Sequence, residues 1–473
     1  MRCLPILSAL LLPAGTAAAA DRPPNLVFIL TDNQGAWTLG CYGNPDIRTP
    51  NIDRLASEGM RFTRALSCNP VCSPTRATYL TGLIPSQHGV HSFLDPKFMV
   101  GPEAYYTLAE FETLPEILHD EGYTCGLVGK WHLGANLAPQ DGFSTWITME
   151  RGSTKDFYTD PVIENGAIKA APKYLTDLWT ERGKRFIEEQ KGSEKPFFLY
   201  LAYNGPYNLG TLLLEPARNR HAATYADRDL PSFPRDSMHP WQHANKPYHN
   251  NLTSIRRVAA ETSAVDDGVG EILAALEENG FGENTLVVYA SDQGWMGGQN
   301  GFFGMGDHTR PTGAHDLMMQ VPLIFRQPDA VAAGTSDLLV SNYDFLPSVL
   351  DQLGLAHRIP ADANLPGHSF APVLKGEEIA WTNEMIYEME GCRSYRDDHW
   401  KIVLRRFPSG PSELYDLQTD PHERFNLFGQ PELAEKQAEL ISKLEAKFTQ
   451  FADPEYDLWK GGRSKAKLHT PVQ

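Results

Sequence analysis

Apolar runs of strand length alternate with amphipathic helical segments along most of this chain. Such alternation is typical of an α/β protein, because strands that are covered on both faces read as continuous apolar runs. We expect strands over residues 25–30, 125–131, 196–203, 285–291 and 321–326. The pattern therefore predicts a large mixed or mostly parallel sheet that is sandwiched by helices.

Two helical segments carry recognisable boundary signals. The first covers residues 49–59 and opens with Thr49 before Pro50, and proline is favoured at the first position of a helix. The second covers residues 263–280 and closes at Gly280, a residue type that commonly ends helices. Helices of this kind are expected on the faces of a doubly wound sheet.

The pattern changes towards the end of the chain. Short apolar runs at 384–389 and 400–407 precede a turn-rich polar stretch and an amphipathic helix over 433–451. This composition favours a smaller C-terminal α+β subdomain with a short antiparallel sheet and a helix. We therefore divide the chain into a larger α/β domain, 21–370, and a C-terminal subdomain, 371–473.

The first residues of the chain resemble a targeting segment rather than a core element. Residues 1–20 contain an early Arg2, an apolar run too short to span a bilayer, and small residues that end before Asp21. The alternative is a buried N-terminal strand. We expect a cleaved signal peptide, and hence an exported protein, periplasmic or secreted, without a membrane span.

Composition limits the partners of the protein. Of its 473 residues 41% are hydrophobic, which is enough for a large core, and the formal net charge is −17. An acidic surface repels nucleic acid and anionic membranes, so we expect neither as a partner. An anionic substrate therefore needs a local cationic pocket. The acidic surface is compatible with a monomer or a dimer.

Polar doublets follow two of the predicted strands. Asp32 and Asn33 follow the first strand, and Asp292 and Gln293 follow the strand at 285–291. The carboxyl ends of parallel strands form the ligand crevice of an open sheet, so the two doublets can converge there. Oxygen ligands of this kind suit a hard cation, with Ca²⁺ favoured and Mg²⁺ as the alternative. The simpler interpretation is that each aspartate caps the next helix.

One cysteine stands in an unusual setting. Removal of the predicted leader leaves five cysteines, an odd number that requires at least one unpaired or modified thiol in an oxidising compartment. Cys68 and Cys72 lie four residues apart, and Cys72 begins the sequence "CSPTR". No second cysteine knuckle is present for a zinc site. A Cys68–Cys72 disulfide and a buried inert thiol are the structural alternatives.

The sequence "CSPTR" resembles the C-x-P-x-R motif of the formylglycine-dependent sulfatases, which belong to the alkaline-phosphatase-like superfamily. The resemblance extends over nearly the whole chain after the leader. It rests on further ordered segments, "PNLVFILTDNQGAWTLGCYGN", "TPNIDRLASEGMRFTRAL", "GYTCGLVGKWHLG", "NTLVVYASDQG" and "ELYDLQTDPHERFNL". It implies an alkaline-phosphatase-like fold and an enzyme that cleaves sulfate esters.

The resemblance also implies roles for particular residues. Cys72 is expected to be oxidised to formylglycine by a maturation enzyme, and the hydrated aldehyde then attacks sulfur. By motif, Arg76 holds the nucleophile and the cation, Lys130 contacts the sulfate, and His132 acts as the base. The cation ligands are expected to be Asp32, Asn33, Asp292 and Gln293, together with the modified Cys72. Taken singly, Arg76, Lys130 and His132 also fit ordinary structural roles.

This chain departs from the family pattern at several positions. The family usually supplies three aspartates to the cation and this chain supplies two, which is expected to weaken cation binding. Tyr207 stands where the family has a histidine that contacts the sulfate, and Met305 stands where it has a lysine. A tyrosine hydroxyl, with an ordinary pKa near 10, is a reluctant proton donor. The general acid is therefore not identified by the sequence.

A cluster of cationic side chains follows Met305. His308, Arg310 and His315 are candidates for restoring a cation or proton donor to the pocket, with a solvated loop as the alternative. His91, which follows the nucleophile segment, is a further candidate for contact with substrate. We expect these residues and Tyr207 to bind substrate.

The function that these observations favour is hydrolysis of a sulfate ester on a sulfated carbohydrate, an oligo- or polysaccharide. Two alternatives stay open. One is a phosphonate monoester or phosphodiester hydrolase of the same superfamily, and the other is a catalytically silent relative that binds sulfated glycans.

Overall fold

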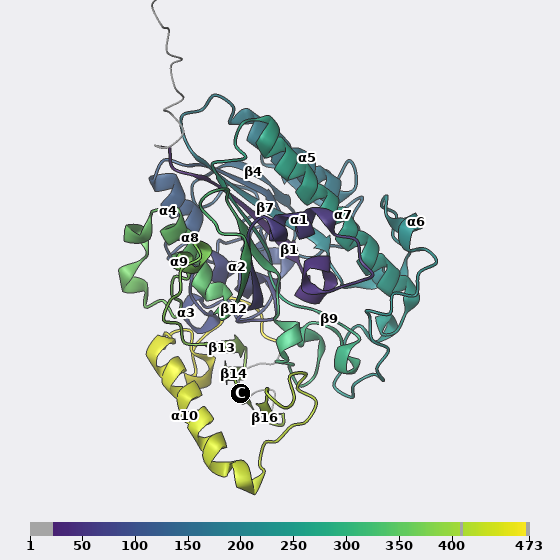
Figure 1. Cartoon of the computed structure of the whole chain (residues 1–473), viewed down its shortest axis with the longest axis vertical. Helices are drawn as coiled ribbons and strands as arrows, with labels where there is room; N and C mark the ends of the chain where they lie inside the picture. Colours follow the sequence, from purple (N-terminus) through teal and green to yellow (C-terminus); the bar gives the residue numbers. More distant parts are fainter. Residues whose placement is uncertain (1–21, 407–409, 470–473) are drawn as a thin grey trace, which may run out of the picture.

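The computed structural model describes residues 22–406 and 410–469 of the chain (Figure 1). The predicted leader, residues 1–20, lies outside the described residues. Within the described residues, every helix is too short or too polar to cross a bilayer.

A ten-stranded sheet runs through the larger part of the molecule (Figure 1). Its strands, in spatial order, are β12 (Gly334–Ser341), β2 (Met60–Leu66), β11 (Leu323–Arg326), β8 (Thr285–Ser291), β1 (Asn25–Asp32), β7 (Phe197–Pro206), β3 (Thr124–Gly129), β4 (Phe143–Met149), β5 (Pro161–Glu164) and β6 (Ala167–Ala170). The neighbours β8, β1, β7, β3 and β4 are parallel, and so are β12 and β2. Strand β11 is antiparallel to both of its neighbours, and β4, β5 and β6 form an antiparallel edge. The sheet is thus mixed, as predicted.

Both faces of the central strands are buried, which explains their continuous apolar sequence. In β1, Leu26, Phe28 and Leu30 point to one core, whereas Val27 and Ile29 point to the other. The first core is closed by α2 (Cys72–Thr81), α4 (Leu114–Asp120), α8 (Phe345–Gln352) and α9 (Ala371–Leu374), and the second by α1 (Pro50–Ser57), α5 (Leu175–Glu189) and α7 (Leu252–Glu278). The prediction of a sheet sandwiched by helices is confirmed.

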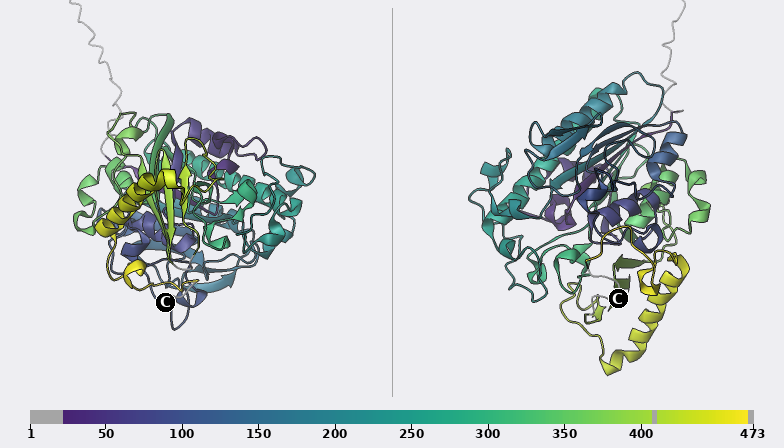
Figure 2. Two further views of the ribbon diagram at one scale, coloured as in Figure 1. Left: turned by 90° about the horizontal axis from the view of Figure 1, so that it is seen from below. Right: turned by 180° about the vertical axis from the view of Figure 1, so that it is seen from behind.

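A four-stranded antiparallel sheet and the helix α10 (Ala434–Phe451) form one end of the molecule (Figure 2). The sheet consists of β13 (Glu384–Met389), β14 (Cys392–Asp397), β15 (Trp400–Arg405) and β16 (Glu413–Asp416). Leu440, Leu444 and Phe448 of α10 share an apolar core with this sheet. Shorter elements are α3 (Pro85–His88), α6 (Ala222–Tyr225), β9 (Met296–Gly297) and β10 (Phe303–Gly304).

The C-terminal sheet holds the loop that follows β10. The Arg405 guanidinium of β15 donates to the carbonyl of Thr312 at 3.0 and 2.7 Å, and the Tyr387 hydroxyl donates to the carbonyl of Gly313 at 3.0 Å. The Lys401 ammonium forms a 2.7 Å ion pair with Asp316. The C-terminal sheet thus determines the course of residues 305–318, which include several of the predicted substrate-binding residues.

Candidate active site

The candidate site forms where four neighbouring strands end. Strand β1 ends at Asp32, and its parallel pairing with β8 places Thr31 opposite Ser291, so Asp292 follows beside it. Lys130 follows the end of β3, and Tyr207 follows the end of β7. The strand order β8-β1-β7-β3 brings these ends to one edge of the sheet. This is the crevice position expected for a ligand in an open parallel sheet.

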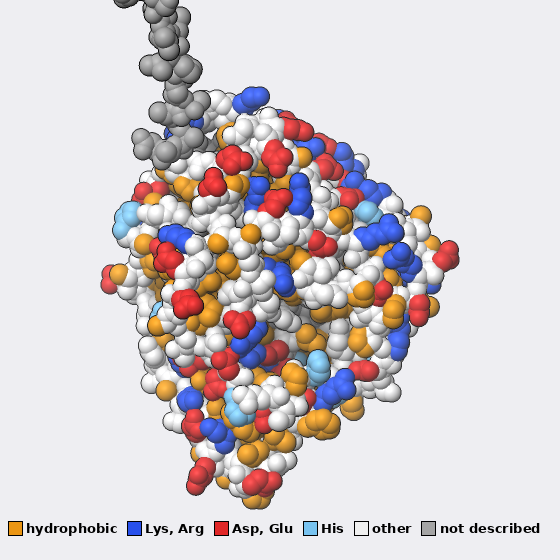
Figure 3. All heavy atoms as spheres, viewed as in Figure 1, with side chains coloured by type: hydrophobic (Ala, Val, Ile, Leu, Met, Phe, Trp, Pro, Cys, Tyr) orange, Lys and Arg blue, Asp and Glu red, His pale blue; other side chains and the backbone are white. Residues whose placement is uncertain are grey.

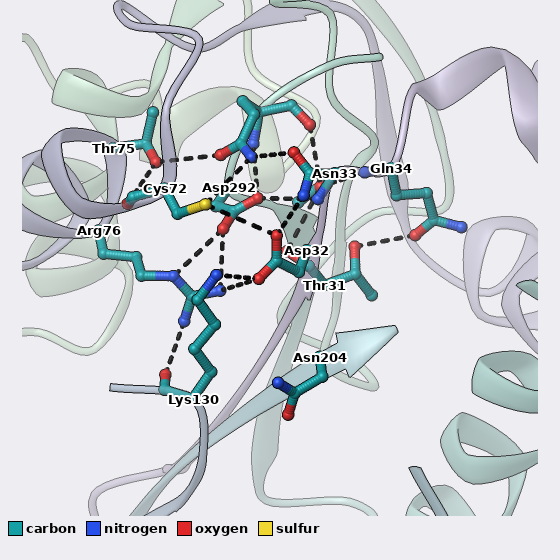
Figure 4. Close-up of polar contacts among 12 residues, drawn as sticks. Thr31, Asp32, Asn33, Gln34, Cys72, Thr75, Arg76, Lys130, Asn204 and Asp292 are labelled. Atoms are coloured by element: carbon teal, nitrogen blue, oxygen red, sulfur yellow. Dashed lines mark hydrogen bonds and ion pairs between the residues drawn. The ribbon is translucent and has the colours of Figure 1, made fainter. Parts of the chain in front are cut away.

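Cys72 is the first residue of the buried helix α2 and points at the ends of β1 and β8 (Figure 4). Its Sγ lies 3.7 Å from Asp32 Oδ1 and 3.5 Å from Gln293 Nε2. Burial, and then the Asp32 charge, raises the pKa of the thiol to about 12. An unmodified Cys72 is therefore a protonated thiol at neutral pH, which is a poor nucleophile.

Two cations pair with the two carboxylates. The Arg76 guanidinium donates to Asp292 Oδ2 through Nε at 3.1 Å and Nη2 at 2.9 Å, and through Nη1 to the Lys130 carbonyl at 2.7 Å. The Lys130 ammonium forms an ion pair with Asp32 Oδ2, and Arg76 Nη2 lies 3.6 Å from the same oxygen (Figure 4). All four side chains are fully buried, so water screens these charges very little.

Two amide side chains, Asn33 and Gln293, lie beside these charged pairs. Asn33 Nδ2 donates to Asp32 Oδ1 at 2.6 Å, and Gln293 Nε2 donates to Asn33 Oδ1. The same Gln293 nitrogen lies 3.6 Å from the Met305 sulfur. Main-chain N–H groups of Asn33 and Gln293 each donate to Asp292 Oδ1 at 3.0 Å, which fixes that carboxylate. The doublets after β1 and β8 therefore meet, as the sequence predicted.

The residues present fit a divalent cation. The ligand atoms of Asp32, Cys72 and Asp292 lie within 4.8 Å of one another, and the Asn33 amide adds a further oxygen. Gln293 turns its Nε2 towards Asn33 and Cys72 and its Oε1 towards Thr75. Burial, followed by the nearby Asp292 charge, raises the pKa of Asp32 above its ordinary value, so a cation placed here stabilises both carboxylates. Oxygen-rich sites of this kind suit Ca²⁺ or Mg²⁺. This set of ligands contains two carboxylates, Asp32 and Asp292.

His132 and Tyr207 flank the charged pairs. His132 has φ 60°, and its Nε2 lies 3.3 Å from the Leu94 carbonyl, while its Nδ1 is buried without a described partner. Burial, with help from the Lys130 and Arg76 charges, lowers the pKa of His132 well below 6.5. The Lys130 ammonium lies 5.4 Å from the centre of the Tyr207 ring. Burial and the Asp32 charge raise the pKa of Tyr207 well above 10.

The remaining predicted substrate-binding residues contact other parts of the chain. His308 Nδ1 lies 3.0 Å from Asn245 Nδ2, and Arg310 Nη1 donates to the carbonyls of Asp307 and Thr309 at 2.6 and 2.7 Å. His315 packs against Phe302 and Tyr415. His91 Nδ1 lies 3.1 Å from the Gly89 carbonyl. Among the polar contacts of the described residues, none joins these four side chains directly to Cys72.

Sequence reasoning did not identify several residues that support the site. Thr75 Oγ1 lies 3.5 Å from Gln293 Oε1, and Asn208 Nδ2 donates to the Asn33 carbonyl at 3.0 Å. Near Arg310, Asp307 forms a 2.9 Å ion pair with His469 from the end of the chain. Of these residues, only Thr75 is indicated by a sequence motif, because it lies within "CSPTR". The other contacts depend on chain segments that are distant in sequence.

Comparisons with known proteins place the chain in a family. A family profile described as "Sulfatase" matches residues 24–355, and one described as "N-sulphoglucosamine sulphohydrolase, C-terminal" matches residues 314–450. The N-acetylglucosamine-6-O-sulfatase of Bacteroides thetaiotaomicron is 28% identical, over 96% of this chain and 94% of the relative. The N-acetylgalactosamine-6-sulfatase of Rattus norvegicus is 32% identical, over 78% of this chain and 69% of the relative.

Solved structures share the fold. A protein solved in complex with its substrate D-glucosamine-2-N,6-O-disulfate has a TM-score of 0.72 and 26% identity, over 92% of this chain and 99% of its own. A putative sulfatase from Bacteroides fragilis has a TM-score of 0.78 and 24% identity, over 93% of this chain and 98% of its own. The family match over most of the chain and the identity to its relatives show that this chain belongs to the sulfatase family, whose members hydrolyse sulfate esters.

Proposed function

We propose that this sulfatase hydrolyses a sulfate ester on a sulfated oligo- or polysaccharide, using formylglycine made from Cys72 and a bound Ca²⁺ or Mg²⁺. The observation that carries the proposal is the position of Cys72. Its sulfur lies at the start of a buried helix, 3.7 Å from Asp32 Oδ1, with Arg76 and Lys130 paired to the adjacent carboxylates. With its pKa raised to about 12, an unmodified Cys72 thiol stays protonated and is a poor nucleophile. This position therefore favours a modified Cys72.

The chain's own residues are arranged to bind and orient a sulfate ester. Lys130 and Arg76 provide N–H donors for the sulfuryl oxygens, where negative charge develops during reaction. The low pKa of His132 keeps its imidazole neutral, and therefore able to accept a proton from the nucleophile. When bound, the cation supplies charge that makes the nucleophilic oxygen more acidic. Asp32, Asn33, Asp292 and Gln293 would hold it.

A carbohydrate substrate is supported by the relatives and by the surface. The relatives described above act, by their names, on sulfated amino sugars, and an ulvan-active sulfatase of Formosa agariphila is 28% identical over 93% of this chain and 84% of its own. Acidic and basic side chains are interspersed on the face seen in Figure 3, so an anionic polysaccharide is not attracted by that face as a whole.

The proposal is tested by the mass of the tryptic peptide 65–76, combined with a sulfate-release assay. The protein is produced together with a formylglycine-generating maturation enzyme, which we propose as its partner in maturation. An aldehyde at Cys72 and release of sulfate from sulfated oligosaccharides are expected. An unmodified thiol at full maturation, or a disulfide to Cys68, contradicts the proposal. Assays on phosphonate monoesters and phosphodiesters compare the related hydrolase activity directly.

A silent glycan-binding protein is a second candidate, favoured by one observation. Tyr207 and Met305, which border the charged pairs, are both uncharged, whereas the family pattern has cationic groups at these positions. A silent protein binds sulfated glycans without releasing sulfate. The sulfate-release assay on the mature protein separates the two candidates. On the strength of the leader sequence, we also propose that the protein is exported, periplasmic or secreted.

A further inference from the structure

The site contains an unusual balance of charge. We propose that the divalent cation and the sulfate group bind this site with strong positive coupling, so that neither binds tightly without the other. The proposal rests on the proposed function, because it concerns the same site and the same sulfate group. It adds a specific property of this chain, which follows from the side chains that surround Cys72.

Four charged side chains act on Cys72 among the described residues. They are Asp32 and Asp292, each with one negative charge, and Arg76 and Lys130, each with one positive charge. Asp32 pairs with Lys130 and Asp292 pairs with Arg76, and the exposed fraction of all four side chains is 0%. The charged groups therefore neutralise one another within the cluster. Without a cation, the site presents no excess positive charge to an anion.

Within residues 22–406 and 410–469, the other side chains that contact this cluster are neutral. Gln293 contacts Cys72, Asn33 and Met305, and the Tyr207 ring lies against the Lys130 ammonium. Burial and two adjacent cations keep His132 uncharged at neutral pH. A sulfate monoester entering this pocket must therefore lose water without meeting an unpaired positive charge, which is costly in a buried site.

The same balance limits cation binding in the absence of sulfate. A divalent cation enters a site in which both carboxylates already have a cationic partner, so the site with the cation has an excess of two positive charges. A bound sulfate ester removes part of that excess at short range, where screening by water is weak. Each ligand thus supplies the charge that the other needs. By thermodynamic linkage, the two affinities must rise by the same factor.

Calorimetric titration of the purified protein measures this factor directly. Inorganic sulfate is titrated into protein freed of divalent cations and into protein with saturating Ca²⁺, and Ca²⁺ is titrated with and without sulfate. We expect each ligand to tighten the other by about fivefold or more. Binding that is seen only with both ligands present also supports the proposal. A factor below about fivefold, or no binding in any combination, overturns it.

Two variants test whether charge is the cause. Met305→Lys adds a positive charge beside Gln293, so sulfate is expected to bind without Ca²⁺ and the coupling factor to fall by at least about half. Ile168→Lys adds the same charge to an exposed position on the edge strand β6, and serves as the matched control with unchanged coupling. Equal coupling in wild type and Met305→Lys overturns the electrostatic explanation.

Asn33→Asp changes the balance in the other direction. A third carboxylate beside Asp32 is expected to tighten Ca²⁺ by roughly tenfold in the absence of sulfate, because it cancels part of the excess positive charge. If Ca²⁺ affinity stays the same, charge deficiency is not what limits cation binding. Met305 and Asn33 are both buried, so the wild-type titrations decide the proposal even when a variant fails to fold.

The titrations do not depend on turnover. They use inorganic sulfate, and they are repeated in Cys72→Ala, which cannot form the nucleophile. Coupling that persists in Cys72→Ala, together with a wild-type protein that releases no sulfate, would contradict the proposed function and leave the coupling intact. Sulfate release by the wild-type protein without coupling would support the proposed function and contradict the proposed coupling.

Discussion

The two sides of the site differ in how much charge they contain. Cys72 is surrounded by two carboxylates, an arginine and a lysine, all fully buried and paired. Tyr207 and Met305, which border the same cluster, are uncharged. The charged residues around Cys72 match the sulfatase pattern, whereas Tyr207 and Met305 depart from it. Catalysis in this protein should therefore depend unequally on the two sides.

The largest effect is expected from removal of the nucleophile. Cys72→Ala should lower kcat by on the order of 10⁴-fold or more, because no other group is placed to attack the sulfur. Sulfate release from a sulfated oligosaccharide measures the loss. Cys68→Ala is the matched control, since Cys68 is equally buried but contacts Thr78 instead of the carboxylates. Comparable losses of kcat in both variants would contradict the assignment of Cys72 as the nucleophile.

The next largest effect is expected from replacement of His132, the proposed base. His132→Gln should lower kcat by about 10²-fold or more, because general bases typically contribute this much. A base works while it is unprotonated, and the pKa of His132 lies well below 6.5, so protonation of His132 should not lower wild-type kcat/KM as the pH falls through 6.5. A pH–rate profile checks this. His119→Gln, at a surface histidine, is the control. An acidic limb centred near 6.5 that is lost in His132→Gln would contradict the assignment.

A gain is expected on the side of the departing alcohol. Tyr207→His introduces a better proton donor, and should raise kcat/KM for poor leaving groups such as sugar alcohols by roughly 10- to 100-fold. Aryl sulfates, which leave readily, should change little. The ratio of kcat/KM for the two substrate classes is the measurement. Tyr207→Phe should stay close to wild type, because the high pKa of Tyr207 makes its hydroxyl a weak acid. A large loss in Tyr207→Phe would show that the hydroxyl is the acid.

The smallest effect is expected in the loop of residues 305–318, which contains Arg310. Arg310→Gln should raise KM for a sulfated oligosaccharide by about 3- to 10-fold with kcat unchanged, because partly exposed charges add modestly to binding. A small aryl sulfate that does not reach the loop should show no change in KM. Arg185→Gln, on the exposed side of α5, is the matched control. A lower kcat with constant KM would place Arg310 at the reacting atoms.

Local patterns in the sequence contained much of the fold. Residues 25–30 and 285–291 read as buried strands, and the structure has strands at Asn25–Asp32 and Thr285–Ser291. The long helix α7 was predicted to begin at 263 but begins at Leu252, where the Asn251 side chain accepts N–H groups of Thr253 and Ser254. Its first turns pack Ile255 and Val258 into a separate apolar cluster. That burial depends on a distant segment, so local periodicity did not indicate it.

The sequence by itself determined the strand and helix types, the polar doublets and the "CSPTR" motif, because these depend on neighbouring residues. Only the tertiary structure decided that β11 runs antiparallel between β8 and β2, and that β12 pairs with β2. It also decided which cation pairs with which carboxylate, since Arg76 and Asp292 are 216 positions apart. Such pairings depend on the packing of the whole sheet, which no local pattern encodes.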